Sequence, residues 1–183
     1  MKITSTFVAC SLAFLILIFG AACTREIAAT SSYAEDRALI EDLQARYMFA
    51  LDFGDMETFA KTFAEDGIID IGDGEVKGRQ KIVEYLNSFS FPDAPAEDPE
   101  LRPATGRHNI TNIVIRIDGD RAVGRAYWFH YGNNNPQRTP TLNSYGHYED
   151  EMVKVNGEWL FSRRLIYNEQ VDKWAANPVN PAW

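Results

Sequence analysis

The sequence predicts an α+β domain, with helices in its first half and antiparallel strands in its second. Between residues 34 and 89, apolar side chains recur at the spacing of amphipathic helices. From residue 107 onward, they alternate with polar side chains, as in strands that bury one face. Turn sequences divide this second part into two hairpins, and helices followed by long hairpins are typical of α+β domains.

The helical part divides at glycines. The first helix is expected over residues 34–53, where Ile40, Leu43 and Tyr47 share one face and Gly54 provides a stop. The next elements are expected to be a helix over 55–66, a short strand over 68–71 and a third helix over 78–89.

The strand part forms two hairpins joined to the helices by an unusual segment. The first hairpin pairs 107–117 with 123–131, and the second runs from 143 to 167 and closes at Asn156-Gly157, a strong hairpin signal. Before them, the proline-rich residues 90–106 are either a lid over a site or a disordered insert. After them, residues 171–183 are expected to form a tail that covers an apolar opening.

The composition is that of a folded, acidic protein. The chain has 183 residues, of which 45% are hydrophobic, and 18 Lys and Arg against 26 Asp and Glu give a net charge of −8. This length suits one domain with its own core. Without a basic cluster, the chain lacks the electrostatic footprint of a nucleic-acid-binding protein, so nucleic acid is not an expected partner.

The first 22 residues have the pattern of an export signal, with a basic start at Lys2, an apolar run and small residues before Cys23. This end resembles the lipobox of bacterial lipoproteins. We therefore expect a protein of the periplasm or outer membrane that is lipid-anchored at Cys23 and tethered by residues 23–33. Simple cleavage and an uncleaved anchor over 3–24 are the alternatives. No cysteine follows Cys23, so a disulfide or a zinc–thiolate site is not expected in the domain.

Several catalytic motifs are missing from the sequence. The glycines over 72–78 fit neither dinucleotide-binding nor P-loop spacing, and there is no nucleophile elbow. The three histidines are far apart, and no metal site is expected. These absences leave acid–base chemistry as the main possibility.

Tyr47, Asp52 and His108 are the candidates for such chemistry. A histidine exchanges protons near neutral pH, and a carboxylate on one ring nitrogen holds its tautomer. A buried tyrosine can donate a hydrogen bond to an oxygen on which negative charge develops. Spacing alone does not bring the three together, and each has a structural alternative: a core tyrosine, a solvated helix end and a hydrogen-bonded barrel histidine.

The strands add candidate substrate contacts. A two-residue loop in the second hairpin places Glu149 opposite Arg164, so that Arg164 could orient a polar substrate; an ordinary cross-strand ion pair is the alternative, and one β-bulge would reverse the parity. On the preceding strand, Phe129 and Tyr131 lie on the face opposite Trp128. They are further candidates, although the alternation does not say which face is internal.

A set of motifs in fixed order resembles the SnoaL-like family of the nuclear-transport-factor-two-like superfamily. The resemblance covers residues 35–167 and defines a domain over 34–170. It is carried by Arg46-Tyr47-Met48-Phe49-Ala50-Leu51-Asp52 with Gly54-Asp55, Gly78-Arg79, His108-Asn109-Ile110-Thr111-Asn112, Tyr148-x-Asp150 and Gly157-x-Trp159-x-Phe161-x-x-Arg164. It implies a cone-shaped α+β barrel in which three N-terminal helices pack on a curved antiparallel sheet around an apolar pocket.

The resemblance also implies a function. Asp52 and His108 match the Asp–His base dyad of hexachlorocyclohexane dehydrochlorinase. At the position of Tyr47 the dehydrochlorinase has lysine, whereas the bile-acid and scytalone dehydratases use tyrosine, so the resemblance to the dehydratases is better. Tyr148 and Arg164 are expected to contact substrate. We thus expect a cofactor-free, dehydratase-like lyase or isomerase that acts on a small apolar carbonyl or hydroxyl compound as a homodimer or homotrimer. A non-catalytic lipoprotein that binds apolar ligands is the alternative.

Overall fold

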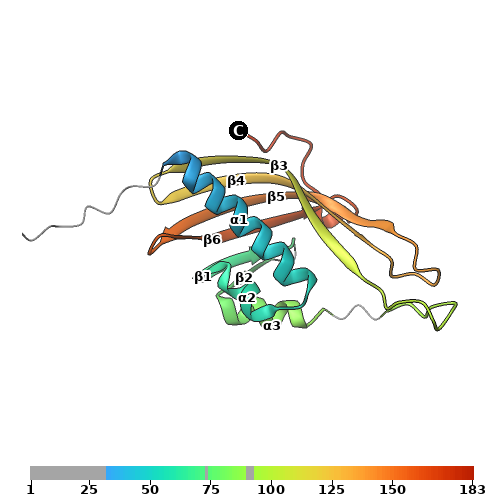
Figure 1. The fold of residues 1–183 in the computed structure, drawn as a ribbon. Coiled ribbons are helices and arrows are strands. Elements are labelled where there is room, and N and C mark those ends of the chain that lie inside the picture. The colour runs from blue at the N-terminus through green and yellow to red at the C-terminus, as the bar shows by residue number, and fades with distance from the viewer. Residues whose placement is uncertain (1–31, 73, 90–92) are drawn as a thin grey trace, which may run out of the picture. The chain divides into compact units, whose positions relative to one another are not determined.

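The computed structural model describes residues 32–72, 74–89 and 93–183 (Figure 1). The described residues, from Ser32 onward, form one compact unit. The expected export signal, Cys23 and all of the tether before Ser32 lie outside the described residues. Among the residues described, no helix is both long enough and apolar enough to cross a membrane.

The first helix matches its prediction closely. α1 (Tyr33–Asp52) begins after Ser32, whose hydroxyl accepts a hydrogen bond from the Glu35 amide at 3.3 Å. The predicted apolar face is buried, since Ile40 and Leu43 have no exposed surface. The helix ends before Gly54, which has a φ of 68°. In this left-handed region glycine carries no steric penalty, so the stop is built into the sequence.

The second helix is shorter than predicted. Asp55 caps α2 (Met56–Lys61) by accepting a hydrogen bond from the Thr58 amide at 3.0 Å. The chain then extends into β1 (Phe63–Asp70), so residues 63–66 form a strand rather than the end of a helix. Phe59 and Phe63 are both fully buried, but from two different elements. Their four-residue spacing imitates one helix face, which is why the prediction ran too far.

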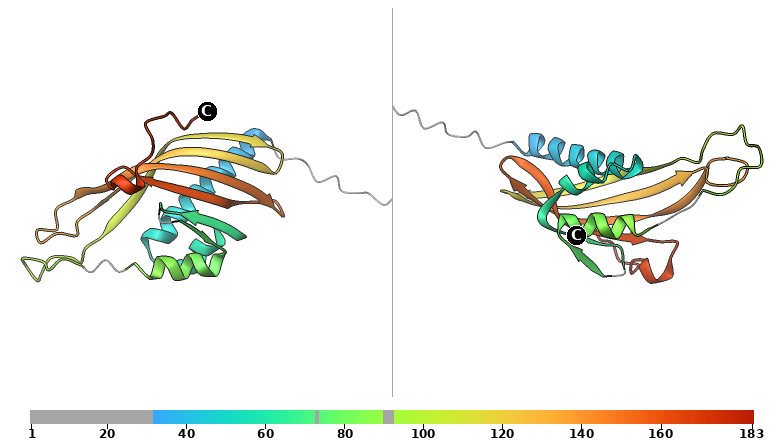
Figure 2. Two further views of the ribbon diagram at one scale, coloured as in Figure 1. Left: turned by 180° about the vertical axis from the view of Figure 1, so that it is seen from behind. Right: turned by 90° about the horizontal axis from the view of Figure 1, so that it is seen from below.

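The remaining elements form a six-stranded sheet with helices on one side (Figure 2). α3 (Arg79–Asn87) precedes the two predicted hairpins. The strand order is β2-β1-β6-β5-β4-β3; β1 pairs parallel with β6, and the other pairs are antiparallel. The predicted α+β class, with helices on a curved sheet, is therefore confirmed. The other elements are β2 (Glu75–Lys77), β3 (Gly106–Asp118), β4 (Arg121–Gly132), β5 (Thr141–Val155), β6 (Glu158–Asn168) and the 3₁₀ helix η1 (Asp172–Trp174).

Of the register shifts in the sheet, two determine which predicted site residues face the helices. In β6, the pairing shifts between Glu151–Arg163 and Met152–Phe161, so Ser162 is an extra residue. Asp150 therefore lies opposite Arg164, and the predicted Glu149–Arg164 pair is wrong. In β3, a second shift falls between residues 111 and 114, where Asn112 has a φ of 53°. Each extra residue reverses the alternation of one strand on one side of the bulge.

The hydrophobic core lies between the helices and the concave side of the sheet. Its centre is aromatic: the Tyr47 ring contacts the rings of Phe59, Phe63 and Phe161, with centroid distances of 4.6, 6.1 and 5.7 Å. Ile113, Ile115 and Ile117, predicted to share one face of β3, pack against this core. Aromatic residues thus join α1 and α2 to β1 and β6.

Candidate active site

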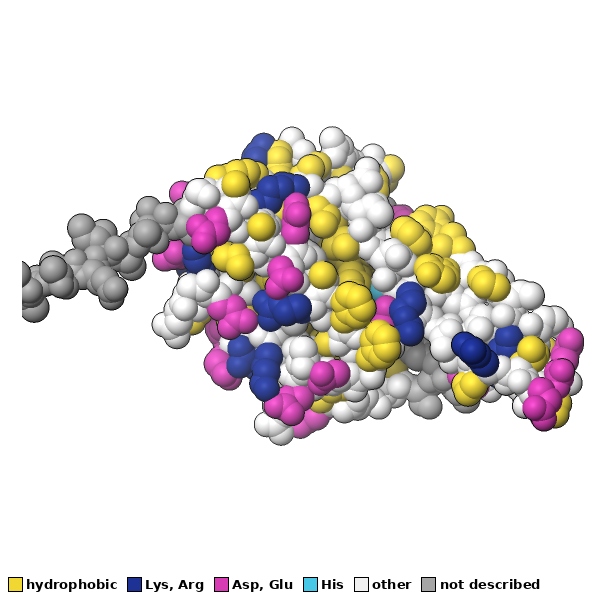
Figure 3. Space-filling model, viewed as in Figure 1, with side chains coloured by type: hydrophobic (Ala, Val, Ile, Leu, Met, Phe, Trp, Pro, Cys, Tyr) yellow, Lys and Arg dark blue, Asp and Glu magenta, His cyan; other side chains and the backbone are white. Residues whose placement is uncertain are grey.

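A small cavity lies between the helices, the sheet and η1, with a volume of about 230 Å³. In the space-filling view, histidine and acidic side chains meet at the edge of a hollow bordered by hydrophobic ones (Figure 3). The walls are mostly apolar, with a few polar groups, as in small-molecule sites generally. The lining residues are Tyr47, Leu51, Ile69, Ile71, Leu86, Phe89, His108, Trp128, Tyr148, Ile166, Asn168 and Trp174.

Asp52 and His108 form a close pair at this cavity. Oδ1 of Asp52 lies 2.6 Å from the ring nitrogen Nδ1 of His108, and Oδ2 accepts a hydrogen bond from the His108 backbone amide at 2.9 Å. The carboxylate therefore fixes both the ring and the backbone of His108. When Nδ1 carries the proton that faces Asp52, Nε2 is left with a free lone pair. The His108 side chain is 24% exposed, whereas that of Asp52 is only 6% exposed.

The positions of the pair follow from the local fold. Asp52 is the last residue of α1, and His108 lies near the start of β3, opposite His130 in β4. The two histidine rings are 4.4 Å apart between centroids. Gly106 makes room for this arrangement, because a Cβ at that position would lie 2.3 Å from Nε2 of His130. Burial lowers the pKa of His130, and the neighbouring His108 lowers it further, so His130 favours its neutral form.

Tyr47 and Tyr148 supply two phenol groups to the cavity wall. Burial raises the pKa of Tyr47, although the nearby Arg164 guanidinium acts in the opposite direction. Burial also raises the pKa of Tyr148 well above its ordinary value, with a contribution from the charge of Tyr47. Both phenols are therefore protonated at neutral pH and can donate hydrogen bonds.

Arg164 lies behind these tyrosines and does not line the cavity. Its side chain has no exposed surface, and its Nε and Nη2 atoms donate to Oδ1 and Oδ2 of Asp150, each at 2.8 Å. Nη2 also donates to Oε1 of Gln44, while Nε2 of Gln44 donates to Asp150 at 2.8 Å. We call Gln44, Asp150 and Arg164 the buried polar cluster. The bulge in β6 places Arg164 there, away from the expected contact with substrate.

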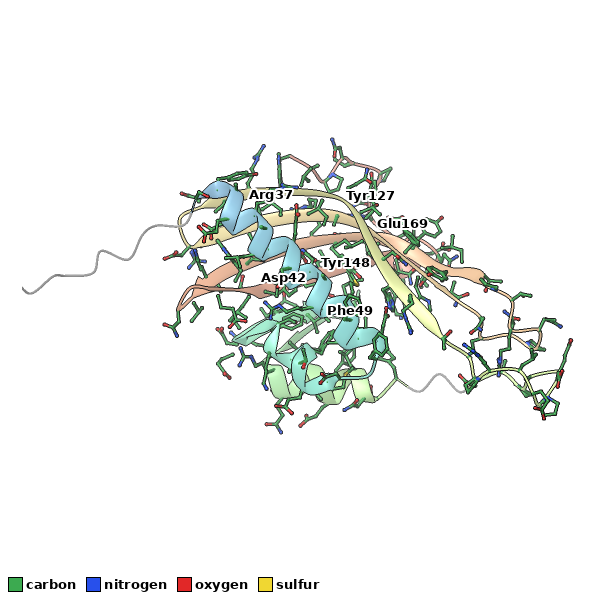
Figure 4. The ribbon with its side chains drawn as sticks, in the orientation of Figure 1. Arg37, Asp42, Phe49, Tyr127, Tyr148 and Glu169 are labelled. Carbon is green, nitrogen blue, oxygen red and sulfur yellow. The ribbon has the colours of Figure 1, made fainter. Side chains whose placement is uncertain are left out.

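Phe129 and Tyr131, also expected to contact substrate, do not line the cavity. They project from the opposite face of β4 to Trp128, as does Tyr127, which is 56% exposed; Tyr148 on the helix side is 2% exposed (both tyrosines are labelled in Figure 4). Their direction follows from the regular alternation of β4, in which Trp128 lies on the helix side; the bulge in β3 determines that His108 shares this side. Counting back from the 118–121 turn without it would pair His108 with Tyr131, whereas the bulge pairs it with His130.

Of the twelve lining residues, sequence reasoning assigned only Tyr47, His108 and Tyr148 to a site; Trp128, Asn168 and Trp174 are among those that it missed. Residues that pair across antiparallel strands share a face, so the His108–His130 pair, if known, would have identified Trp128 as internal. Trp174 packs against Gly72 and brings the C-terminal tail to the cavity, at the kind of apolar opening expected for that tail.

The described part of the proline-rich segment, from residue 93 onward, does not line the cavity. Of its described part, the Ala94 amide donates to the Asn134 side chain at 2.6 Å and the Glu97 amide donates to the Pro136 carbonyl at 2.9 Å. Arg138 in turn donates to the Ala94 carbonyl at 2.8 Å. Residues 93–105 therefore pair with the β4–β5 connection, and none of them lines the cavity. Nor do the described ranges contain a group of three metal-ligating side chains.

Comparisons with known proteins agree with this architecture. The family model of the SnoaL-like domain matches residues 32–165. One similar structure is Rv3472, a function-unknown protein of Mycobacterium tuberculosis, which is 26% identical with a TM-score of 0.61 over 76% of this chain and 77% of that chain. Another is a provisionally assigned scytalone dehydratase of Novosphingobium aromaticivorans, which is 25% identical with a TM-score of 0.56 over 73% and 83%.

A third similar structure, ActVI-ORFA of Streptomyces coelicolor, is 21% identical with a TM-score of 0.62, over 74% of this chain and 98% of that chain. At this identity the likeness shows the fold alone. A search of curated proteins returned no significant match.

Proposed function

The chain belongs to the SnoaL-like domain family, and from this premise we propose that it is a cofactor-independent lyase or isomerase. Its substrate is a small apolar compound that carries a carbonyl or hydroxyl group. The observation that carries the proposal is the Asp52–His108 pair, held by two contacts of 2.6 and 2.9 Å in the wall of an apolar cavity. Acid–base catalysis requires such a positioned base.

In the proposed reaction, His108 moves the proton. Nε2 removes a proton from the carbon next to the substrate carbonyl, and Asp52 stabilises the positive imidazolium that forms. The phenol of Tyr47 donates a hydrogen bond to the carbonyl oxygen as that oxygen gains negative charge. In a dehydration, the C–O bond of the neighbouring hydroxyl then breaks, the double bond forms, and Nε2 returns its proton to the departing hydroxide as water. In an isomerisation, Nε2 returns the proton to another carbon.

The small cavity and its aromatic walls support a compact substrate. A volume of about 230 Å³ lies below the usual range for drug-sized ligands, which begins near 300 Å³. Tyr47, Trp128 and Tyr148 provide flat apolar surfaces, while Trp174 contributes to the wall from the tail. Excluding water around the dyad strengthens its electrostatic interactions with the substrate.

The experiment is a search for turnover with matched variants. The purified full chain is incubated with small hydroxy-ketones, phenolic polyketides, halogenated rings and steroids, and mass spectrometry follows loss of water, loss of hydrogen halide and shifts in retention at unchanged mass. The His108→Gln variant removes the base. The His147→Gln variant is the control, because that histidine is buried in a different environment, stacked on Tyr167 at 4.6 Å.

A product formed by the wild type and the control, but not by His108→Gln, supports the proposal and identifies the substrate class. Ligands that all three proteins retain equally without conversion would contradict catalysis. That result would favour the alternative in which the cavity only binds apolar molecules.

We also propose that the protein is exported and anchored by a lipid on Cys23, with residues 1–22 removed. The apolar run after Lys2 and the small residues before Cys23 support this proposal. Cell fractionation tests it: the Cys23→Ser variant should leave the membrane fraction, and only the wild type should carry the mass of a lipid. An unmodified Cys23 in the membrane-extracted wild type would contradict it.

A further inference from the structure

The guanidinium of Arg164 lies against aromatic faces, including those of both cavity tyrosines. Its Cζ atom is 4.2 Å from the centroid of the Tyr47 ring, 4.1 Å from that of Tyr148 and 4.0 Å from that of Phe161. A cation at such distances is attracted to the negative face of a ring. All four side chains are almost completely buried, so water does not screen this interaction.

The remaining contacts of Arg164 hold it in this position. Three of its hydrogen bonds go to Asp150 and Gln44, on the side of the buried polar cluster. Nη1 is different: it is buried and makes no hydrogen bond. A guanidinium that only stabilised the fold would normally satisfy every donor. Here one amino group is left among the aromatic rings.

From this geometry we infer that Arg164 is a positioning residue that strengthens the phenols of Tyr47 and Tyr148 as hydrogen-bond donors toward an oxyanion in the cavity. The cation withdraws electron density from the two rings through space, so a phenol can share its proton more fully with a negative oxygen. Arg164 itself never touches the substrate. The inference deepens the proposed function, because it assigns these tyrosines to a substrate oxygen that becomes negative.

The negative charge of Asp150 opposes the effect of the Arg164 cation on an oxyanion in the cavity. The pair has no net charge, so its effect on the cavity depends on which end lies nearer the rings. The guanidinium contacts the rings directly, and the carboxylate is bound at its edge, through Nε and Nη2. Because the positive end faces the phenols, the pair as a whole favours negative charge in the cavity. The two charges should therefore affect an oxyanion with opposite signs.

The test uses 4-nitrophenol as a probe, because its ionised form absorbs visible light and the bound phenolate can be quantified by its absorbance. Titrating it into the full chain gives the ionised fraction in the cavity and the affinity for the phenolate, without any turnover. The probe is read in the wild type, in Tyr47→Phe to verify its location, and in the cluster variants. This readout separates the inference from the proposed function, since an inactive protein can still stabilise a bound phenolate.

The two variants of the buried polar cluster are chosen because they should change the affinity for the phenolate in opposite directions. In Arg164→Met/Asp150→Leu, both charges are lost together, so no unpaired charge is left in the core. We expect this variant to bind the phenolate roughly tenfold more weakly. In Asp150→Asn, the cation remains while the opposing charge is lost, and we expect tighter phenolate binding. Arg163→Met is the control, because Arg163 lies on the same strand but pairs with Asp70 and Glu75.

Opposite changes in the two cluster variants, with Arg163→Met unchanged, support the inference. Weaker binding in both variants, or no change in either, would overturn it and leave Arg164 with a structural role alone. If the double variant fails to fold, Asp150→Asn still decides: tighter phenolate binding supports the inference, and equal or weaker binding overturns it.

Discussion

Two aspartates each bind a basic side chain in this domain, with different consequences. Asp52 uses both oxygens on His108, and Asp150 uses both on Arg164. The first pair ends in a ring that is 24% exposed and lines a cavity, whereas the second has no exposed surface at all. The His108 ring keeps a free nitrogen for a substrate, while the Arg164–Asp150 pair is closed by Gln44. Similar local bonding therefore leaves one pair accessible from a cavity and encloses the other in the core.

The comparison predicts that substituting the aspartate of each pair changes a different property of the protein. The largest expected effect is on turnover. Asp52→Asn keeps the shape of the side chain but loses its charge, so His108 loses the partner that stabilises its protonated form. We expect turnover to fall roughly a hundred- to ten-thousand-fold with little change in KM. Initial rates measure this effect, with the substrate that the turnover experiment identifies. Equal losses in turnover and in affinity would contradict the assigned role.

Breaking the buried Asp150–Arg164 pair should instead lower the stability of the fold. Asp150→Ala leaves the Arg164 charge buried without its carboxylate, and we expect the free energy of unfolding to fall by about 3–5 kcal/mol. Urea denaturation followed by circular dichroism measures this change. Asp52→Asn is the matched control, with an expected loss below about 2 kcal/mol. Equal losses in the two variants would remove the distinction between the pairs.

A smaller effect is expected where the tail meets the cavity. Gly72 has a φ of 84°, and a Cβ there would lie 2.2 Å from the Trp174 ring. Gly72→Ala should displace Trp174, reduce stability by about 1–3 kcal/mol and weaken binding of apolar ligands. Gly119→Ala is the control, because Gly119 also has a positive φ but no atom within 4 Å of the added Cβ. Equal ligand affinity in both variants would show that Trp174 is dispensable.

The smallest effect concerns pH. Because the pKa of His130 is lowered in the folded protein from its ordinary 6.5, the unfolded state binds more protons just below that pH. The stability contributed by neutral His130 is complete above about pH 6.5 and is lost as the pH falls toward the folded pKa. His130→Gln should flatten this slope. Urea midpoints between pH 5 and 8 measure it, and an unchanged slope in the variant would refute the assignment.

The element types could be predicted from the sequence because periodicity reports them directly. The face of Ile113, Ile115 and Ile117 and the turn at Asn156-Gly157 are local properties, and both agree with the structure. The end of α2 could not be predicted, since Phe63 continues an apolar spacing while its partner Phe161 is remote in sequence.

The site was harder to predict because one extra residue in a strand reverses which face of the sheet its following side chains occupy. Ser162 and the residues around Asn112 each add one position to a strand, and no strong sequence signal marks either bulge. The first places Arg164 behind the tyrosines, and the second places His108 on the face of Trp128 instead of the face of Phe129 and Tyr131. The meeting of Asp52 with His108 was likewise invisible to spacing; the resemblance to known dehydratases suggested it, and the fold places the two side chains in contact.

One unbroken helix, α1, carries a residue of the buried polar cluster, a residue of the cavity wall and the aspartate of the dyad. Gln44 of the buried cluster, Tyr47 of the cavity and Asp52 of the dyad all lie on α1, within eight residues of one another. Because these residues share one helix backbone, we expect a substitution that repacks Gln44 to affect the position of Asp52 as well. Substitutions at these positions should therefore be epistatic, with double-mutant effects that differ from the sum of the single ones. A lineage that adapts this cavity to a new substrate has to change α1 as a unit, and the order of its mutations will matter.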